Sequence, residues 1–133
     1  ELILIGFAAS FAAKLADTFG SEIGKIYGRN TFLISSLRRV PPGTEGAISP
    51  AGTLATILGS LLMTISMTSL SIIPATPNVF LVVLFSGFIA TLCESVIGAV
   101  IQHRFDWLTN ELVNSLQTSI SALIAICLSI IIV

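Results

Sequence analysis

Long apolar segments are the feature that most constrains this chain. The stretches 51–73, 79–101 and 112–133 are each long enough to cross about 30 Å of hydrocarbon as a helix. A fourth stretch, 2–16, is shorter and predicts a truncated first helix. With 54% hydrophobic and only 10% charged residues, the composition is unlike that of a soluble domain. We therefore expect an all-α, polytopic membrane bundle of about four transmembrane helices, in which residues 1–133 form one membrane domain, the C-terminal portion of a larger protein.

The basic residues are unevenly distributed, although the net charge is only −1. They are Lys14, Lys25, Arg29, Arg38, Arg39 and Arg104. All of them lie at the end of the first apolar segment or in the loops 17–50 and 102–111, while the connection 74–78 carries no charge. By the positive-inside rule, both charged loops are expected on the same face of the membrane, in the cytoplasm or the stroma of a plastid. No nucleic-acid partner is expected.

Polar and glycine residues share one face around the end of the first segment. At about 100° per residue, that face holds Asp17, Gly20, Ser21, Gly24 and Gly28, with Lys14 and Lys25 beside it. Glycines at this spacing are typical of tight helix–helix packing. A carboxylate on the same face must be neutralised or paired. The face therefore suits either a packed seam or a phosphate–metal complex close to the backbone.

The following loop ends in RRVPPGTEGAISPAGT. Ser49 before Pro50 predicts an N-cap with proline at the first helical position. Arg38, Arg39 and the run 43–46 thus lead into a helix N-terminus, where free N–H groups attract anions. The alternative is a glycine-rich connector whose arginines reach the interface.

Glu94 is the most costly residue in the apolar segments. It lies roughly 10 Å below the charged end, at 1.5 Å per residue, and shares a small-and-polar face with Gln102. A glutamate in this position is either a protonated hydrogen-bonding partner or a functional residue lining a wet cavity. A similar polar stripe on the last segment comprises Asn110, Asn114, Gln117 and Ser121.

Four sequence blocks resemble a known membrane family. They read DTFGSEIGKIYGR, VPPGTEGAISPAGTLA, ESVIGAVIQ and FDWLTNELVN. In this order they look like the conserved blocks of the phytyl-phosphate kinases of the transmembrane protein 19 family, in particular the cyanobacterial and plastid members. The resemblance implies transfer of a phosphoryl group from a nucleoside triphosphate, with CTP favoured, to phytyl phosphate. The product is phytyl diphosphate, used for tocopherol and phylloquinone synthesis. It also implies an integral protein of a cyanobacterial membrane or the plastid envelope.

Phosphoryl transfer depends mainly on alignment and charge neutralisation, so charged and glycine positions receive the expected roles. Asp17 and Glu94 are expected to hold Mg²⁺, and Glu22 to act with them as a catalytic residue. The expected phosphate- and nucleotide-binding residues are Ser21, Gly24, Lys25, Arg38, Arg39, Gly43, Thr44, Glu45 and Gly46. Gln102, Asn110 and Asn114 form the polar stripe that opens toward them. The expected partners are the lipid bilayer, an isoprenoid phosphate and a nucleotide.

Two other classes of function stay open at this point. A CTP-dependent cytidylyltransferase or a polyprenol kinase-like lipid enzyme would use the same cation and phosphate groups. A non-enzymatic transporter or structural membrane protein would use Glu94 and the asparagine stripe for permeation or packing.

Overall fold

Four long helices make up most of the computed structural model, which describes all 133 residues. They are α1 (Leu2–Tyr27), α2 (Pro50–Ser69), α3 (Pro77–Val100) and α4 (Asn110–Ile132). A short 3₁₀ helix, η1 (Gln102–Arg104), follows α3, and β1 (Phe32–Leu33) pairs antiparallel with β2 (Ala47–Ile48). All four long helices are long and apolar enough to cross a membrane. The predicted all-α membrane bundle is therefore confirmed.

Helix α1 is longer than its apolar segment. It has 26 residues and continues past residue 16 to Tyr27, so the charged connection begins at Gly28 rather than at residue 17. Two ion pairs with i,i+3 spacing, Lys14–Asp17 and Lys25–Glu22, lie along this extension. Such pairs support a helix after the hydrophobic pattern has ended. The apolar segment alone therefore underestimates the length of the first helix.

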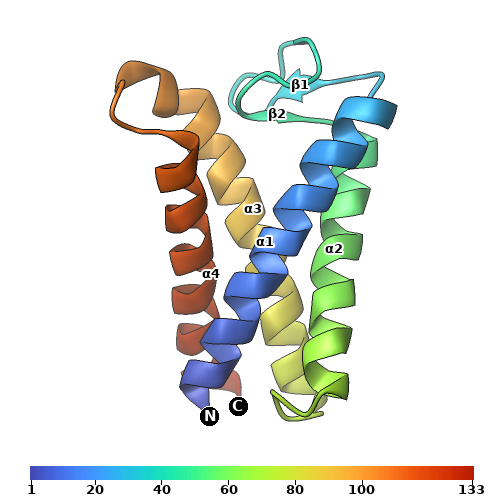
Figure 1. Cartoon of the computed structure of the whole chain (residues 1–133), viewed down its shortest axis with the longest axis vertical. Coiled ribbons are helices and arrows are strands. Elements are labelled where there is room, and N and C mark those ends of the chain that lie inside the picture. Colours follow the sequence, from blue (N-terminus) through green and yellow to red (C-terminus); the bar gives the residue numbers. More distant parts are fainter.

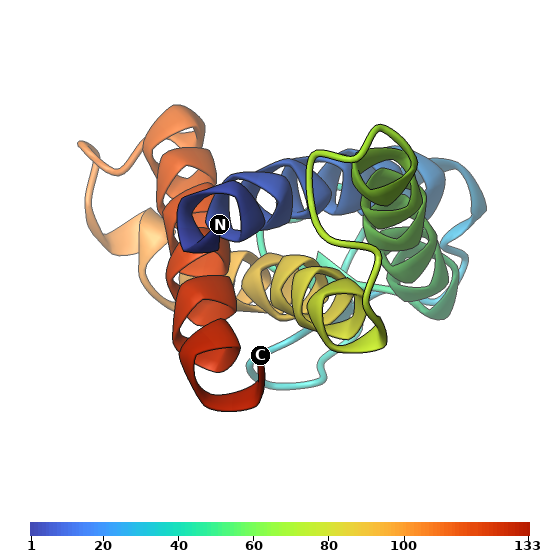
Figure 2. The same cartoon turned by 90° about the horizontal axis from the view of Figure 1, so that it is seen from below.

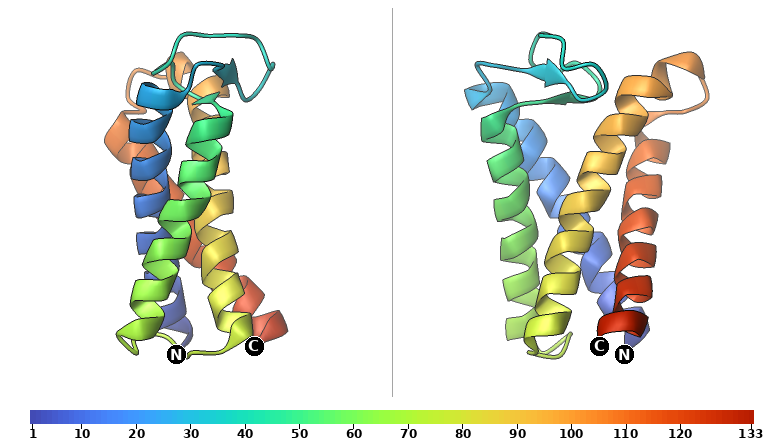
Figure 3. Two further views of the ribbon diagram at one scale, coloured as in Figure 1. Left: turned by 90° about the vertical axis from the view of Figure 1, so that its right-hand side faces the viewer. Right: turned by 180° about the vertical axis from the view of Figure 1, so that it is seen from behind.

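The chain runs up and down through the bundle. The connections 28–49 and 101–109 lie at one end, and the connection 70–76 lies at the other end with both termini (Figure 1, Figure 3). Seen along the bundle, α1 and α3 lie between α2 and α4 (Figure 2). Helix α1 contacts each of the other three helices. Helix α1 crosses from α4 near its start to α2 near its end, so its polar face packs against α2 at the end that carries the two charged connections (Figure 2).

Polar caps begin three of the helices. The Ser49 hydroxyl accepts a hydrogen bond from the Gly52 N–H at 3.0 Å, and Pro50 occupies the first turn of α2. This confirms the predicted N-cap. Thr76 and Thr109 cap α3 and α4 in the same way. Each cap satisfies a backbone donor that would otherwise lack a partner at a helix start.

The helices pack through small residues and carry their large ones outside. The buried face of α1 holds Ala8, Ala9, Ala12, Ala13 and Ala16, which are all 0% exposed. The large apolar side chains that remain exposed include Ile3, Leu54, Leu62, Leu81, Phe85 and Ile130. Lipid solvates such side chains, so close backbone packing becomes a main source of helix association in a bilayer.

We expect Gly59→Ala to destabilise the bundle. A Cβ at this position would lie 2.7 Å from the Leu15 carbonyl oxygen and 2.9 Å from the Ala16 Cα. Both atoms belong to the backbone of α1, so the helices must move apart, at a cost of about 1–3 kcal/mol. In a helix with space for the methyl group, Gly→Ala is stabilising. A loss of stability would therefore show that the two helices are in close contact at this position. Thermal unfolding in detergent measures it, with the exposed Leu58→Ala as control. A Gly59→Ala protein as stable as wild type would contradict the packing.

Candidate functional site

A cavity of about 360 Å³ lies at the end of the bundle that carries the longest connection. It is walled by α1, the segment 42–49, the start of α2, the later part of α3 and the start of α4. Its charged and amide residues are Asp17, Lys25, Glu45, Glu94, Asn110 and Asn114. Its hydroxyl residues are Ser21, Thr31, Thr44, Ser49, Thr53, Thr56, Thr91 and Ser95. Only 3 of its 23 lining residues are hydrophobic, so it is suited to a polar ligand.

Glycines form the wall between α1 and α2. Gly20, Gly24 and Gly52 all line the cavity. They also bring the two helices together, since a Cβ on Gly52 would lie 3.0 Å from the Gly20 carbonyl oxygen and 3.4 Å from the Gly24 Cα. The packed seam and the ligand-facing wall, considered as alternatives from the sequence, are thus one surface. Gly28 ends α1 and does not line the cavity.

The segment 42–49 supplies a wall with unused backbone donors. Gly43 and Gly46 have φ values of +88° and +73°, which favour glycine. Gly46 packs on α3 so closely that a Cβ would lie 2.5 Å from the Ser95 carbonyl oxygen. The backbone N–H groups of Gly43, Glu45 and Gly46 donate no hydrogen bond within the protein. These donors lack an acceptor in the protein, and the Gly46 nitrogen packs against Gly98 of α3.

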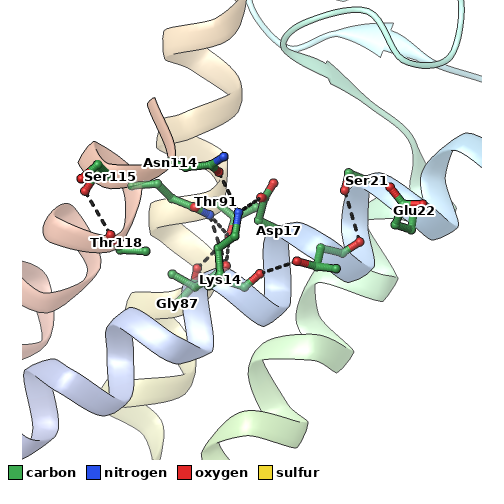
Figure 4. Close-up of polar contacts among 12 residues, drawn as sticks. Lys14, Asp17, Ser21, Glu22, Gly87, Thr91, Asn114, Ser115 and Thr118 are labelled. Carbon is green, nitrogen blue, oxygen red and sulfur yellow. Dashed lines mark hydrogen bonds and ion pairs between the residues drawn. The ribbon is translucent and has the colours of Figure 1, made fainter. Parts of the chain in front are cut away.

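Negative charge dominates the cavity. Three carboxylates, Asp17, Glu45 and Glu94, face one lining lysine, Lys25. Lys25 forms an exposed ion pair with Glu22 at 3.1 Å. Lys14, which is not among the lining residues, pairs with Asp17 Oδ2 at 3.1 Å (Figure 4). Because carboxylates in a membrane domain require compensation, the cavity favours a ligand that brings a cation.

The helical hydroxyls add electron-rich oxygen to the same surface. Thr56, Thr91 and Ser95 each donate to the backbone carbonyl four residues earlier, at 2.9, 3.0 and 3.2 Å. Each hydroxyl hydrogen is thus already used, so the lone pairs can only accept or coordinate, and one lone pair of Thr91 already accepts from Gln117 Nε2 at 3.1 Å. The α2 and α3 walls therefore present acceptors.

These residues fit a magnesium ion shared with phosphate. Mg²⁺ prefers hard oxygen ligands and usually takes one or two carboxylates together with phosphate oxygens. Asp17 and Glu94 line one cavity and supply such ligands. No three Asp, Glu, His or Cys side chains group closely enough to enclose a metal by themselves. A metal here would be completed by its phosphate ligand.

Four residues expected at the site do not line the cavity: Glu22, Arg38, Arg39 and Gln102. Glu22 is exposed because it lies about 100° around the helix from Ser21. Arg39 donates to the Asn30 side chain, and Arg38 is exposed on the same loop. Gln102 donates to Asn110, so it contacts the site only through that residue.

The sequence reading missed the contribution of α2. Thr53 and Thr56 line the cavity although neither was a candidate. A signal was present, because Gly52, Thr56 and Ser60 recur at four-residue spacing and mark a small, polar helix face. The position of α2 against Gly20 turns that face toward the site.

Comparisons with known proteins agree with a membrane family. Residues 1–122 match the family described as "Integral membrane protein DUF92". The chain is 47% identical over 124 residues to the uncharacterized membrane protein sll0875 of Synechocystis sp. (strain ATCC 27184 / PCC 6803 / Kazusa), covering 93% of this chain and 47% of that protein. It is 42% identical over 128 residues to "Protein VTE6, chloroplastic" of Arabidopsis thaliana, covering 95% of this chain and 38% of that protein.

A third relative comes from an archaeon. The uncharacterized membrane protein MJ0933 of Methanocaldococcus jannaschii is 33% identical over 123 residues, covering 92% of this chain and 50% of that protein. The chain thus spans half or less of the length of these curated relatives. No solved structure matches it. The match over most of its residues shows that the chain belongs to the DUF92 family of integral membrane proteins.

Proposed function

We propose that the protein is a membrane phosphotransferase that moves a phosphoryl group from a nucleoside triphosphate, with CTP favoured, to phytyl phosphate. One observation carries the proposal. A single polar cavity combines the carboxylates of Asp17 and Glu94 with Lys25 and with unused backbone N–H groups. The four sequence blocks that resemble those of the phytyl-phosphate kinases support the same activity, and the similarity to the chloroplastic VTE6 protein supports a membrane protein of phytyl phosphate metabolism.

Different residues of this chain would bind the cation and the phosphate groups of the reactants. Asp17 and Glu94 would hold Mg²⁺, which neutralises developing charge on the transferred phosphoryl group. Lys25 and the N–H group of Gly43 would bind phosphate oxygens. Such preorganised donors stabilise the transition state most when water is excluded.

The chemical step needs no dedicated base. A terminal oxygen of phytyl phosphate attacks the γ-phosphorus, and the bond from that phosphorus to the bridging β-oxygen breaks. The products are phytyl diphosphate and a nucleoside diphosphate. Because the second pKa of a phosphate monoester is about 6, the attacking oxygen is already ionised near neutral pH. Alignment of the two phosphates is therefore the main task of the site.

The lipid part of the substrate would lie outside this cavity, whose lining is almost entirely polar. The outer faces of the helices carry large apolar side chains such as Leu54 and Phe85. A phytyl chain would lie in the bilayer against such faces, with its phosphate at the charged end.

A transfer assay with the full-length protein tests the proposal. CTP, ATP, GTP and UTP are compared as donors, each labelled at the α- or γ-phosphorus, with phytyl phosphate as acceptor. Label from the γ-position in the lipid, with release of nucleoside diphosphate, is expected. Label from the α-position with release of pyrophosphate would instead identify a cytidylyltransferase. Absence of transfer from every donor would contradict both activities.

We also propose that the connections 28–49 and 101–109 face the cytoplasm or stroma, where nucleotides are available. Five of the six Lys and Arg residues lie at this end of the bundle, the sixth, Lys14, lies near the middle of α1, and none lies at the other end. Cys93 and Cys127 are first replaced, and Pro42→Cys or Ala75→Cys is then introduced as the single cysteine. In sealed membrane vesicles, a thiol reagent that does not cross the membrane should label these two cysteines from opposite sides. Both positions are exposed, so each is open to reagent. Labelling of both from the same side would contradict the topology.

A further inference from the structure

Lys14 links two residues of the cavity from outside its lining. It lies near the middle of α1, where an ionised lysine is costly in a membrane unless it is paired. Its Nζ donates to Asp17 Oδ2 at 3.1 Å and to Asn114 Oδ1 at 2.9 Å (Figure 4). The second bond crosses from α1 to α4. One lysine thus contacts a carboxylate and an amide that both line the cavity.

The lysine fixes the orientation of the Asn114 amide. An ammonium group is a donor only, so the Asn114 atom that it contacts must be the oxygen. The amide nitrogen then lies on the other side of the group, and its two hydrogens have no partner within the protein. Asn110 is held instead by Gln102, whose amide can both donate and accept, so its orientation is not fixed in this way.

The contacts of Lys14 leave one acceptor of Asp17 and one donor of Asn114 without a partner. Asp17 keeps Oδ1, a negatively charged acceptor, and Asn114 keeps its amide nitrogen, a neutral donor. When a cation is bound to a phosphate, the cation needs a negatively charged acceptor and the phosphate oxygen needs a donor, and these two groups meet both needs. This arrangement rests on the proposed function only for the identity of the phosphate compound.

We propose that Asn114 binds a phosphate oxygen of the ligand through its side-chain nitrogen and that Lys14 is the positioning residue that sets its orientation. Asn114 thereby becomes the anion-binding neighbour of the cation-binding Asp17. The polar stripe of α4 then has a chemical role beyond packing. Farther along it, Gln117 and Ser121 bond to the backbone of α1 and hold the two helices together.

The decisive variant is Asn114→Asp. It retains an oxygen for Lys14, so the fold should be as stable as wild type, but it replaces the free donor with a negatively charged acceptor. In purified full-length protein, binding of inorganic pyrophosphate with Mn²⁺ should weaken about tenfold or more, because like charges oppose each other. Binding of Mn²⁺ alone, followed by electron paramagnetic resonance, should not weaken. A protein that folds and binds pyrophosphate as wild type does would overturn the proposal.

Asn30→Asp is the matched control. Asn30 accepts from Arg39 at the same end of the bundle but does not line the cavity. The change in charge is identical, so pyrophosphate binding should stay at the wild-type level. A loss equal to that of Asn114→Asp would show a general charge effect and overturn the specific site.

The role of Lys14 is tested by non-additivity. Lys14→Met should weaken pyrophosphate binding severalfold, and Lys14→Arg should retain more of it. In an Asn114→Ala background the Lys14→Met change should cost less than it does alone, because it acts through Asn114. Fully additive losses would overturn the positioning role. If wild-type protein binds pyrophosphate through Asn114 yet transfers no phosphoryl group, the proposed kinase fails and the site stands.

Discussion

Asp17→Asn is expected to abolish nearly all phosphoryl transfer while the protein still inserts and folds. The amide keeps the shape of the side chain, but it removes the negative charge from the cavity wall where α1 faces Glu45 and Glu94. Removing one charge-stabilising group from a preorganised site costs about 10²–10³ in turnover. Loss of a metal ligand would add to this effect. The measurement is turnover as a function of Mg²⁺ concentration, in full-length protein.

Asp106→Asn is the control for this prediction. Asp106 is exposed in the connection between η1 and α4, at the same end of the bundle and outside the cavity. It should retain turnover and Mg²⁺ dependence. Near-normal activity of Asp17→Asn, with the Mg²⁺ dependence of wild type, would give Asp17 a packing role with Lys14 as its only partner.

The bundle could be predicted because its strongest signals are local. Apolar segments of sufficient length must form helices in hydrocarbon, and Ser49 with Pro50 marks the start of α2 without reference to any other helix. The end of α1 follows only partly from such local signals, because the i,i+3 ion pairs along its extension favour helix but do not show where it ends. Its last turns depend on Gly20 and Gly24 packing against Gly52, a contact between residues far apart in the sequence.

The candidate site shows the same division. Helical spacing was enough to group Asp17 with the glycines of its own face, and the cavity brings that face together with Glu94. Residue spacing could not show that Arg38 and Arg39 lie outside the cavity. A loop has no regular repeat, so the sequence does not indicate in which direction its side chains point. The link from Lys14 to Asn114 joins residues 100 positions apart, so no local pattern contains it.

The carboxylates of the cavity also affect the stability of the folded protein. Glu94 makes no hydrogen bond or ion pair with the protein, whose salt bridges are Lys14–Asp17 and Lys25–Glu22. It is half-buried and shares its cavity with two further carboxylates. Such an unpaired group is a source of instability that natural proteins retain mainly where function requires it.

We therefore expect Glu94→Gln to separate stability from activity. The amide has the same shape and relieves repulsion with Asp17 and Glu45, so the unfolding temperature should be unchanged or higher. Turnover should fall by about 10²-fold or more if the carboxylate holds the metal or orients a phosphate. The two quantities are measured on the same purified full-length protein.

Glu111→Gln provides the control for Glu94, since Glu111 is exposed at the start of α4 and does not line the cavity. It should leave turnover near the wild-type level. If Glu94 acts only as a neutral acid that donates a hydrogen bond to the ligand, the glutamine amide can replace it and Glu94→Gln will also keep full activity. That result would remove Glu94 from the metal site. A folded, more stable and inactive Glu94→Gln protein would instead show that the chain keeps an unpaired carboxylate there because the reaction requires its charge.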